Sequence, residues 1–346
     1  MRNPLAKLAP LAAAALATLA ACGGTSQSLE QRSREAMPSK DSVAVATPKS
    51  SASALRADRG NTSSSFTQDQ QDSTVGQVSG SYLLTVTLAG SINGAVIWTL
   101  GLIETISDLP PTSCTSDTCT WGPGSGALDP ADWKLEVKHD ATADTFAYAL
   151  SGRAKAGGDG QFHSVVTGVA KPTVIPHRGS GSFVVDFDAG KVINPLSTDL
   201  GKLEVDYSNA VAGQGHIDAQ FLGVRDGDHP GDATHPPQQL NAAYGFDEDA
   251  AGGGSLQIAF RNLTTLDTVA IHSRWKSSGA GRGDEAVHIN GASGSFYEAQ
   301  LSECWSKPPF LVTYFHTSDA AHLGADSGSA ADCAFTDVSA ATKTAP

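Results

Sequence analysis

The chain has 346 residues, of which 40% are hydrophobic and 17% charged, with a formal net charge of −13. This acidic balance disfavours nucleic acid and anionic lipid as binding partners, and it favours solubility. The sequence also lacks nucleophile-elbow, zinc-protease, phosphate-loop and dinucleotide-binding motifs, so we predict a non-enzymatic protein without a cofactor.

The N-terminus has the layout of a secretory signal peptide. Arg2 and Lys7 precede an uncharged apolar run that is too short to span a bilayer as a helix. This run closes with Leu-Ala-Ala-Cys22, which resembles the lipobox of bacterial lipoproteins. The resemblance implies that residues 1–21 are a signal peptide and that Cys22 is acylated as a membrane anchor. Gly23, in place of Asp, implies by the same resemblance an outer-membrane location.

Residues 22–77 are rich in Ser, Thr, Gln and Asp and lack a sustained apolar period. This composition predicts a disordered tether, which as a flexible chain would hold the body roughly 40 Å from the membrane. Within it, Ser28 and Gln31 have capping-box spacing for a short, transient helix that ends near Met37.

Residues 78–346 are predicted to form a single all-β domain. Apolar and polar residues alternate in several segments, as in Leu203, Val205 and Tyr207, and the same period predicts a strand over Tyr82, Leu84, Val86 and Leu88. We therefore predict an antiparallel meander of about 12 to 14 strands, closed as a barrel or folded as a sandwich, without an amphipathic helix. A membrane-spanning barrel shows the same alternation, but the long polar tether disfavours it.

A weak internal repeat supports this prediction. The pattern of a glycine followed by alternating apolar residues and a phenylalanine occurs at 181–187, 215–221 and 254–260, and a fourth, degenerate copy begins at Gly294. Each step is long enough for a β-hairpin and its loops.

Two stretches of the body resemble known lipoproteins. The segment 185–205 is similar to strand-turn-strand units in β-barrel surface lipoproteins of the transferrin-binding type. The stretch that includes Ser273-Arg-Trp275 and Glu303-Cys-Trp305 is similar to uncharacterised lipoproteins of the myxobacterial kind. Neither resemblance implies an activity or a ligand-contact motif.

Four cysteines remain once Cys22 is assigned to the anchor. An even number in an exported chain predicts two disulfides, for which three pairings exist. Local pairs are favoured, because Cys114 and Cys119 bracket a short polar turn and because Cys304 and Cys333 both lie near the C-terminus. The alternative of a redox or zinc site lacks a Cys-x-x-Cys motif.

One acidic loop offers possible metal ligands. Its carboxylates suit calcium and its imidazoles suit a transition metal, although a solvated connector is the favoured interpretation because the EF-hand register is absent. The candidate ligands are Asp226, Asp228, His229, Asp232 and His235.

Three further features have both a structural and a functional interpretation. Arg282-Gly-Asp284 matches the integrin-binding tripeptide, but a simple hairpin loop is favoured. His139 is interpreted as a core histidine rather than a ligand, and Trp121 as packed under its loop rather than as an exposed contact residue.

Two functions are weighed for this body. The favoured one is a membrane-anchored envelope lipoprotein that binds a small molecule, glycan or protein, with the loops 107–131 and 223–239 as candidate rims. The other is a structural lipoprotein without a ligand pocket. A large apolar cavity would favour the first, and a filled core with a flat apolar patch the second. A hydrolase is a weaker alternative, and it requires convergent Ser, His and Asp side chains.

Overall fold

The computed structural model describes residues 27–40, 43–48, 74–125, 131–155, 161–197, 199–225, 239–290 and 296–346. The helices are α1 (Leu29–Ala36), α2 (Gly80–Ser107), α3 (Phe187–Ile193) and α4 (Ala320–Leu323), with a 3-10 helix at Ala330–Asp332. The strands are β1 (Ser113–Cys114), β2 (Thr118–Gly124), β3 (Ala131–Asp140), β4 (Thr145–Ala154), β5 (His163–Pro172), β6 (Gly179–Asp186), β7 (Leu200–Ser208), β8 (His216–Arg225), β9 (Leu240–Glu248), β10 (Gly254–Asn262), β11 (Thr268–Trp275), β12 (Gly281–Asn290), β13 (Phe296–Trp305), β14 (Val312–Thr317) and β15 (Ser327–Gly328).

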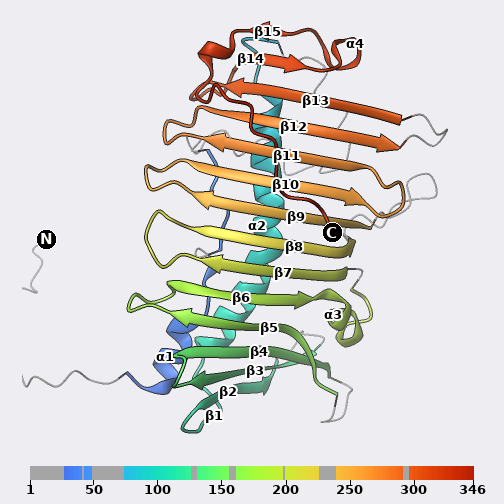
Figure 1. Ribbon diagram of the computed structural model, residues 1–346. Coiled ribbons are helices and arrows are strands. Elements are labelled where there is room, and N and C mark those ends of the chain that lie inside the picture. Colours follow the sequence, from blue (N-terminus) through green and yellow to red (C-terminus); the bar gives the residue numbers. More distant parts are fainter. Residues whose placement is uncertain are drawn as a thin grey trace, which may run out of the picture.

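These 15 strands form one antiparallel sheet in which every strand pairs with its sequence neighbour, from β1 to β15. The predicted all-β meander is therefore confirmed. The sheet is not closed into a barrel, because β1 and β15 lie at opposite ends of it (Figure 1), and the strands form one sheet rather than the two of a sandwich. Closure is unnecessary because α2 runs across the strands and covers one face, which we call the inner face.

The predicted strand over Tyr82 to Leu88 is wrong, since this segment is the first part of the 28-residue helix α2. No amphipathic helix is expected from the sequence of the body, and α2 is a long, mostly apolar helix rather than an amphipathic one. Buried side chains recur every three or four residues along α2, at Tyr82, Thr85, Leu88, Ala89, Ile92, Val96, Leu100 and Ile103. This is the helical period, and four alternating residues were too short a window to separate it from a strand. Each large apolar side chain buried here contributes about 1.5–3 kcal/mol.

The N-terminus of α2 is fixed by two buried glutamates of the inner face. The cap Ser79 accepts a hydrogen bond from the Tyr82 nitrogen (3.0 Å), and its hydroxyl donates to Glu303. Ser81 donates from its nitrogen to Glu303 Oε1 (3.0 Å) and from its hydroxyl to Glu285 Oε1 (2.7 Å). The positive end of the helix dipole stabilises carboxylates at this position.

Glycines on the inner face make room for large aromatic side chains of the adjacent strand. Gly168 pairs with Tyr148, Gly181 with Tyr207, Gly254 with Trp275 and Gly281 with Trp305. A Cβ atom at Gly254 would lie 2.5 Å from the Trp275 ring, and one at Gly281 would lie 2.3 Å from the Trp305 ring. These rings therefore lie directly over the glycines, which fixes the strand register.

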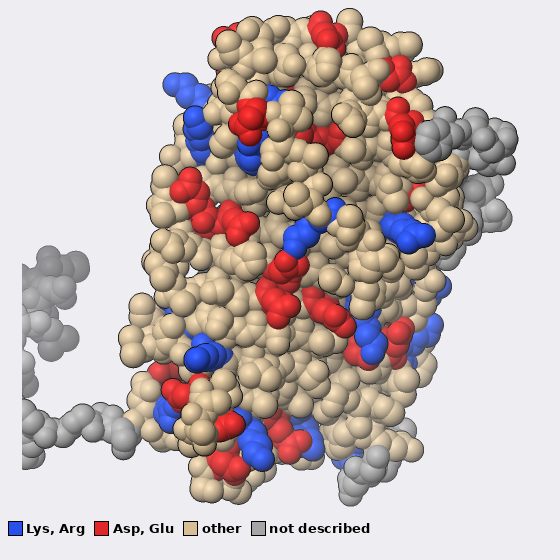
Figure 2. Space-filling model, in the orientation of Figure 1, with Lys and Arg blue, Asp and Glu red and all other residues tan. Residues whose placement is uncertain are grey.

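The opposite, outer face divides into two regions. Over β3 to β7 it is open, and Figure 2 shows Lys and Arg interspersed with Asp and Glu on this side of the molecule, whereas Lys343 of the C-terminal tail pairs with Asp218 of β8. Strand β7 illustrates the predicted alternation, since Leu203, Val205 and Tyr207 are buried whereas Lys202 and Glu204 are exposed. Over β9 to β13, residues 334–346 cross the strands in front of the sheet (Figure 1).

This C-terminal tail buries polar residues that the sequence predicted to face solvent. His272 donates from Nδ1 to the Ser339 carbonyl (2.9 Å), and Arg274 donates to the Asp337 carbonyl (2.6 Å). The Phe335 ring lies 5.0 Å from the Arg274 guanidinium. The expectation of one wet face therefore fails for β11, because a segment distant in sequence covers it.

Part of the predicted tether is ordered. Ser28 caps α1 by accepting from the Gln31 nitrogen (3.2 Å), as the capping-box spacing predicted. The helix packs against β2, β3 and β5, and Ala36 and Met37 are buried in the core. Disorder is therefore wrong for Leu29–Ala36, because these residues bury apolar surface on the sheet. The rest of 22–77 lies outside the described residues, apart from 27–40, 43–48 and 74–77.

Candidate functional site

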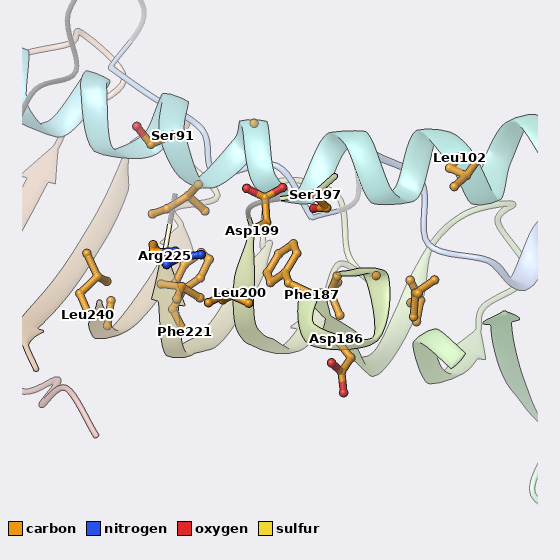
Figure 3. Close-up of a pocket in the computed structure, with 18 of the residues that line it drawn as sticks. Ser91, Leu102, Asp186, Phe187, Ser197, Asp199, Leu200, Phe221, Arg225 and Leu240 are labelled. Carbon is orange, nitrogen blue, oxygen red and sulfur yellow. The ribbon is translucent and has the colours of Figure 1, made fainter. Parts of the chain in front are cut away.

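A cavity of about 1030 Å³ lies between α2 and the inner face of the sheet. Its walls come from α2, α3 and strands β3 to β10, and Figure 3 shows the lining residues spread along the helix. Most of them are apolar, including Leu88, Ile92, Leu150, Val166 and Ile258. The volume is at the upper end of the roughly 300–1,000 Å³ typical of small-molecule sites.

Three phenylalanines of the internal repeat line this cavity. Phe187, Phe221 and Phe260 each close one copy of the repeat. Their strands β6, β8 and β10 alternate with β7 and β9, so the repeat places an aromatic side chain at the same inner edge of every second strand. Phe187 begins α3 and points toward α2 (Figure 3). The predicted strand-turn-strand unit at 185–205 is therefore interrupted by a helix.

Asp186 belongs to the framework of the cavity rather than to its interior. Its carboxylate points away from α2 (Figure 3), caps α3 by accepting from the Ala189 nitrogen (2.8 Å), and pairs with Lys202 Nζ (3.0 Å). Burial raises the pKa of this carboxyl, but the Ala189 hydrogen bond and the Lys202 charge outweigh burial, so the pKa is lowered overall. Asp188, two residues on, accepts from the Gly201 nitrogen (3.1 Å).

The remaining polar residues of the lining differ in depth. Ser197, Asp199 and Arg225 are partly or fully exposed, and Figure 3 shows Ser197 and Asp199 close to α2 and Arg225 beside Phe221. Tyr244, by contrast, is 1% exposed on the inner face of β9, and its hydroxyl has no hydrogen-bond partner among the described residues. Burial, together with the Asp218 charge, raises the pKa of this phenol, so the hydroxyl is protonated at neutral pH.

Both predicted disulfides are confirmed. The sulfurs of Cys114 and Cys119 are 2.08 Å apart, and those of Cys304 and Cys333 are 2.10 Å apart. The first closes the β1–β2 hairpin, and the second attaches the start of the C-terminal tail to β13. Neither pair borders the cavity.

Other predicted site residues have structural roles or lie outside the described residues. The lipidation candidate Cys22 and the metal candidates Asp226, Asp228, His229, Asp232 and His235 belong to the second group. Most of the rim 223–239 is also undescribed, and the described part of the rim 107–131 contributes only Ala131 to the lining. Within the ranges given above, no group of three or more His, Cys, Asp or Glu side chains could hold a metal ion.

The integrin-like tripeptide is neither a loop nor a surface motif. Arg282 and Asp284 lie on β12, are 1% and 4% exposed, and form an ion pair with each other at 2.8 Å. Trp121 is 2% exposed and donates to the Leu109 carbonyl (2.8 Å), so its packed interpretation is confirmed. His139 stacks on Phe146, as expected of a core histidine.

One serine-histidine contact bears on the hydrolase alternative. Ser255 Oγ and His272 Nε2 are 2.9 Å apart, and the other ring nitrogen contacts the Ser339 carbonyl rather than a carboxylate. The pair lies on the outer face beneath the C-terminal tail, and neither residue borders the cavity. This geometry attaches the tail to the sheet, and it does not supply the convergent Ser, His and Asp that the hydrolase alternative requires.

Two general comparisons complete the description. No helix in the described part of the chain combines the length and the apolarity needed to span a bilayer. Searches among family models, curated proteins and solved structures find no match for this chain. The functional argument therefore depends on the cavity and its chemistry.

Proposed function

We propose that this chain is a lipid-anchored envelope protein that binds an apolar small molecule between α2 and the inner face of the sheet. The observation that carries the proposal is the apolar cavity of about 1030 Å³. Protein interiors are normally close-packed, so an apolar space of this size between a helix and a sheet, partly open to solvent, is better suited to a ligand than to structural support alone. The cavity therefore favours the binding function over a structural lipoprotein without a pocket.

The anchoring part of the proposal is supported by the sequence. Leu-Ala-Ala-Cys22 resembles a lipobox, and each buried methylene of an attached acyl chain contributes about 0.8 kcal/mol to membrane binding. We expect the native chain to carry acyl mass and to sediment with membranes, and the Cys22→Ser variant to do neither. Unmodified native protein in the soluble fraction would refute the anchor and leave the cavity argument intact.

Filling the cavity tests the binding part. Ala242 of β9 and Gly190 of α3 line it from different elements, and a Cβ at Gly190 meets open space. We expect Ala242→Phe and Gly190→Leu to weaken binding of an uncharged fluorescent probe such as N-phenyl-1-naphthylamine by at least about tenfold, because the added side chains occupy the ligand's space. The matched control is Ala147→Phe on the exposed outer face of β4.

The control separates occupancy from general damage. All three variants are compared by circular dichroism and thermal midpoint before binding is measured. Probe binding that is equal in the wild type, both filling variants and the control would locate the probe elsewhere and refute the proposed site.

A further inference from the structure

The cavity is much longer than it is wide. Its lining extends from Trp133 on β3 to Phe260 on β10, and on α2 from Leu88 to Leu102. Eight adjacent strands have seven spacings of roughly 4.8 Å, which gives about 34 Å measured along the sheet. Spread over that length, 1030 Å³ corresponds to a mean cross-section of about 30 Å², or about 6 Å across. One extended hydrocarbon chain fits this width, since carbon atoms in contact lie ~3.5–4.0 Å apart.

Among the described lining residues, Tyr244 is the fully buried side chain that offers such an acyl chain an unpartnered hydroxyl. Tyr244 lines the cavity at β9, near the Phe260 end rather than the Trp133 end, and its hydroxyl has no partner among the described residues. A buried hydroxyl without a hydrogen bond is costly, and a ligand that supplies an acceptor recovers that cost. A plain hydrocarbon has no acceptor, whereas the carbonyl oxygen of an acyl group does.

The protonation state and surroundings of Tyr244 indicate whether the acceptor group of the ligand is charged or neutral. A tyrosine hydroxyl is protonated at neutral pH, and burial raises the pKa of Tyr244 further, so this hydroxyl is available as a hydrogen-bond donor. No basic side chain is among the apolar residues of the inner face beside it on β9 and β10, where Ala242, Phe246, Leu256 and Ile258 are its described neighbours. The basic residue of the described lining, Arg225, follows Val224, which pairs with Leu240, four residues along β9 from Tyr244. An ionised carboxylate bound to the Tyr244 hydroxyl would therefore be desolvated without an adjacent counter-charge, so a neutral ester, amide or protonated acid is favoured.

We propose that the cavity binds one extended acyl chain and that the Tyr244 hydroxyl donates a hydrogen bond to the acyl carbonyl oxygen. This inference rests on the proposed function, because it specifies the apolar ligand of the same cavity. It predicts that one chain is bound, so a lipid that buries two chains side by side in the cavity would contradict it.

The chain provides a matched pair of tyrosines for the test. Tyr148 is 3% exposed and also has an unpartnered hydroxyl, but it does not line the cavity. Methyl hexadecanoate and hexadecane are titrated as competitors of the fluorescent probe against the wild type, Tyr244→Phe and Tyr148→Phe. Removing an unpartnered hydroxyl should not lower the thermal midpoint of either variant, so both are expected to fold.

We expect Tyr244→Phe to weaken binding of methyl hexadecanoate about three- to tenfold and to leave hexadecane unchanged. Tyr148→Phe should change neither. Equal affinity of the ester for Tyr244→Phe and the wild type would overturn the inference while the proposed function stands. Failure of both compounds to bind the wild type would refute the acyl ligand, and failure of the probe as well would refute the proposed function.

A second experiment distinguishes the possible sources of the bound acyl chain. The protein is incubated either with vesicles that contain both phosphatidylcholine and lysophosphatidylcholine or with free hexadecanoic acid, re-isolated, and its bound lipid is identified by mass spectrometry. Stoichiometric lysophospholipid indicates a membrane source, and stoichiometric fatty acid a free source, and either supports the single-chain ligand. Stoichiometric two-chain phosphatidylcholine would overturn it.

Discussion

Asp284 is the residue whose replacement should damage the fold most clearly. It lies on the outer face of β12 and is 4% exposed beneath the C-terminal tail. Its carboxylate accepts hydrogen bonds from Arg282 Nε (2.8 Å), Ser302 Oγ (2.6 Å) and the Ser339 nitrogen (3.0 Å), and it lies 3.4 Å from Arg274 Nη2. One side chain thus connects β11, β12, β13 and the tail.

Replacing Asp284 with alanine leaves the Arg282 guanidinium, which is 1% exposed, without its buried counter-charge. Removing one partner of a buried ion pair costs about 3–5 kcal/mol. For a domain of this size, each kcal/mol lowers the thermal midpoint by about 2–4 °C, so the expected decrease is about 6–20 °C. The measurement is thermal and urea unfolding followed by circular dichroism with the disulfides intact.

The matched control is Asp337→Ala, which removes a carboxylate from the same cluster. Asp337 pairs with Arg274 Nη1 at 2.8 Å, but its side chain is 69% exposed, so solvent screens the pair and the midpoint should change little. If both variants shift the midpoint equally, or if Asp284→Ala shifts it by less than about 2 °C, the cluster is not a buried ion-pair network and the argument is refuted.

Three further predictions follow from the same structure. Replacing Cys304 and Cys333 with serine should destabilise the chain by about 3.5 kcal/mol, since the disulfide closes a loop of 29 residues; unchanged urea unfolding would contradict the loop-entropy estimate. Gly90→Ala on the exposed side of α2 should stabilise by up to about 1 kcal/mol, whereas Gly181→Ala, whose Cβ would lie 2.3 Å from a carbonyl oxygen, should destabilise by about 1–3 kcal/mol; equal midpoints would argue against the register described here. Burial lowers the pKa of His272 below 6.5, so its contribution to stability should be complete above that pH and decrease as the pH falls below it; a His272→Asn variant with an unchanged pH slope between pH 5 and 8 would contradict this.

The sequence predicts the fold class well where one face of a strand is wet. In β7 the period of two is visible because Lys202 and Glu204 face solvent on the open part of the outer face. The short loops between successive apolar segments then predict antiparallel neighbours, and the structure has them throughout the sheet. Local cysteine pairing is predictable for a related reason, since each pair is close in sequence.

Local sequence patterns do not indicate which distant segments pack against each other. The alternation from Tyr82 to Leu88 is compatible with a strand and with two helical turns, and only the burial of Ile92, Val96 and Leu100 further along decides for the helix. Likewise, nothing local in β11 indicates that the C-terminal tail covers it.

The candidate site was missed for a different reason. Its polar residues follow no motif, but the final phenylalanines of the three repeat copies all border the cavity. The repeat predicts hairpins, but it also places a phenylalanine at the end of each copy. Because these copies fall on every second strand, the repeated phenylalanine was the available sign of a shared cavity wall.

The docking of α1 determines how the protein would stand on a membrane. The cap Ser28 lies only six residues after Cys22, and an extended chain covers at most about 3.6 Å per residue, so an acyl group on Cys22 would be attached within about 22 Å of α1. Because α1 packs on β2, β3 and β5, acylation at Cys22 would keep this end of the sheet at the bilayer.

The opposite end would then point away from the lipid. Fifteen strands spaced by roughly 4.8 Å make the sheet about 65–70 Å tall, so β12 to β15 would extend far into the aqueous compartment. The strand order would then run away from the membrane surface, with the β3 end of the cavity near the bilayer and the β10 end farther into the aqueous compartment.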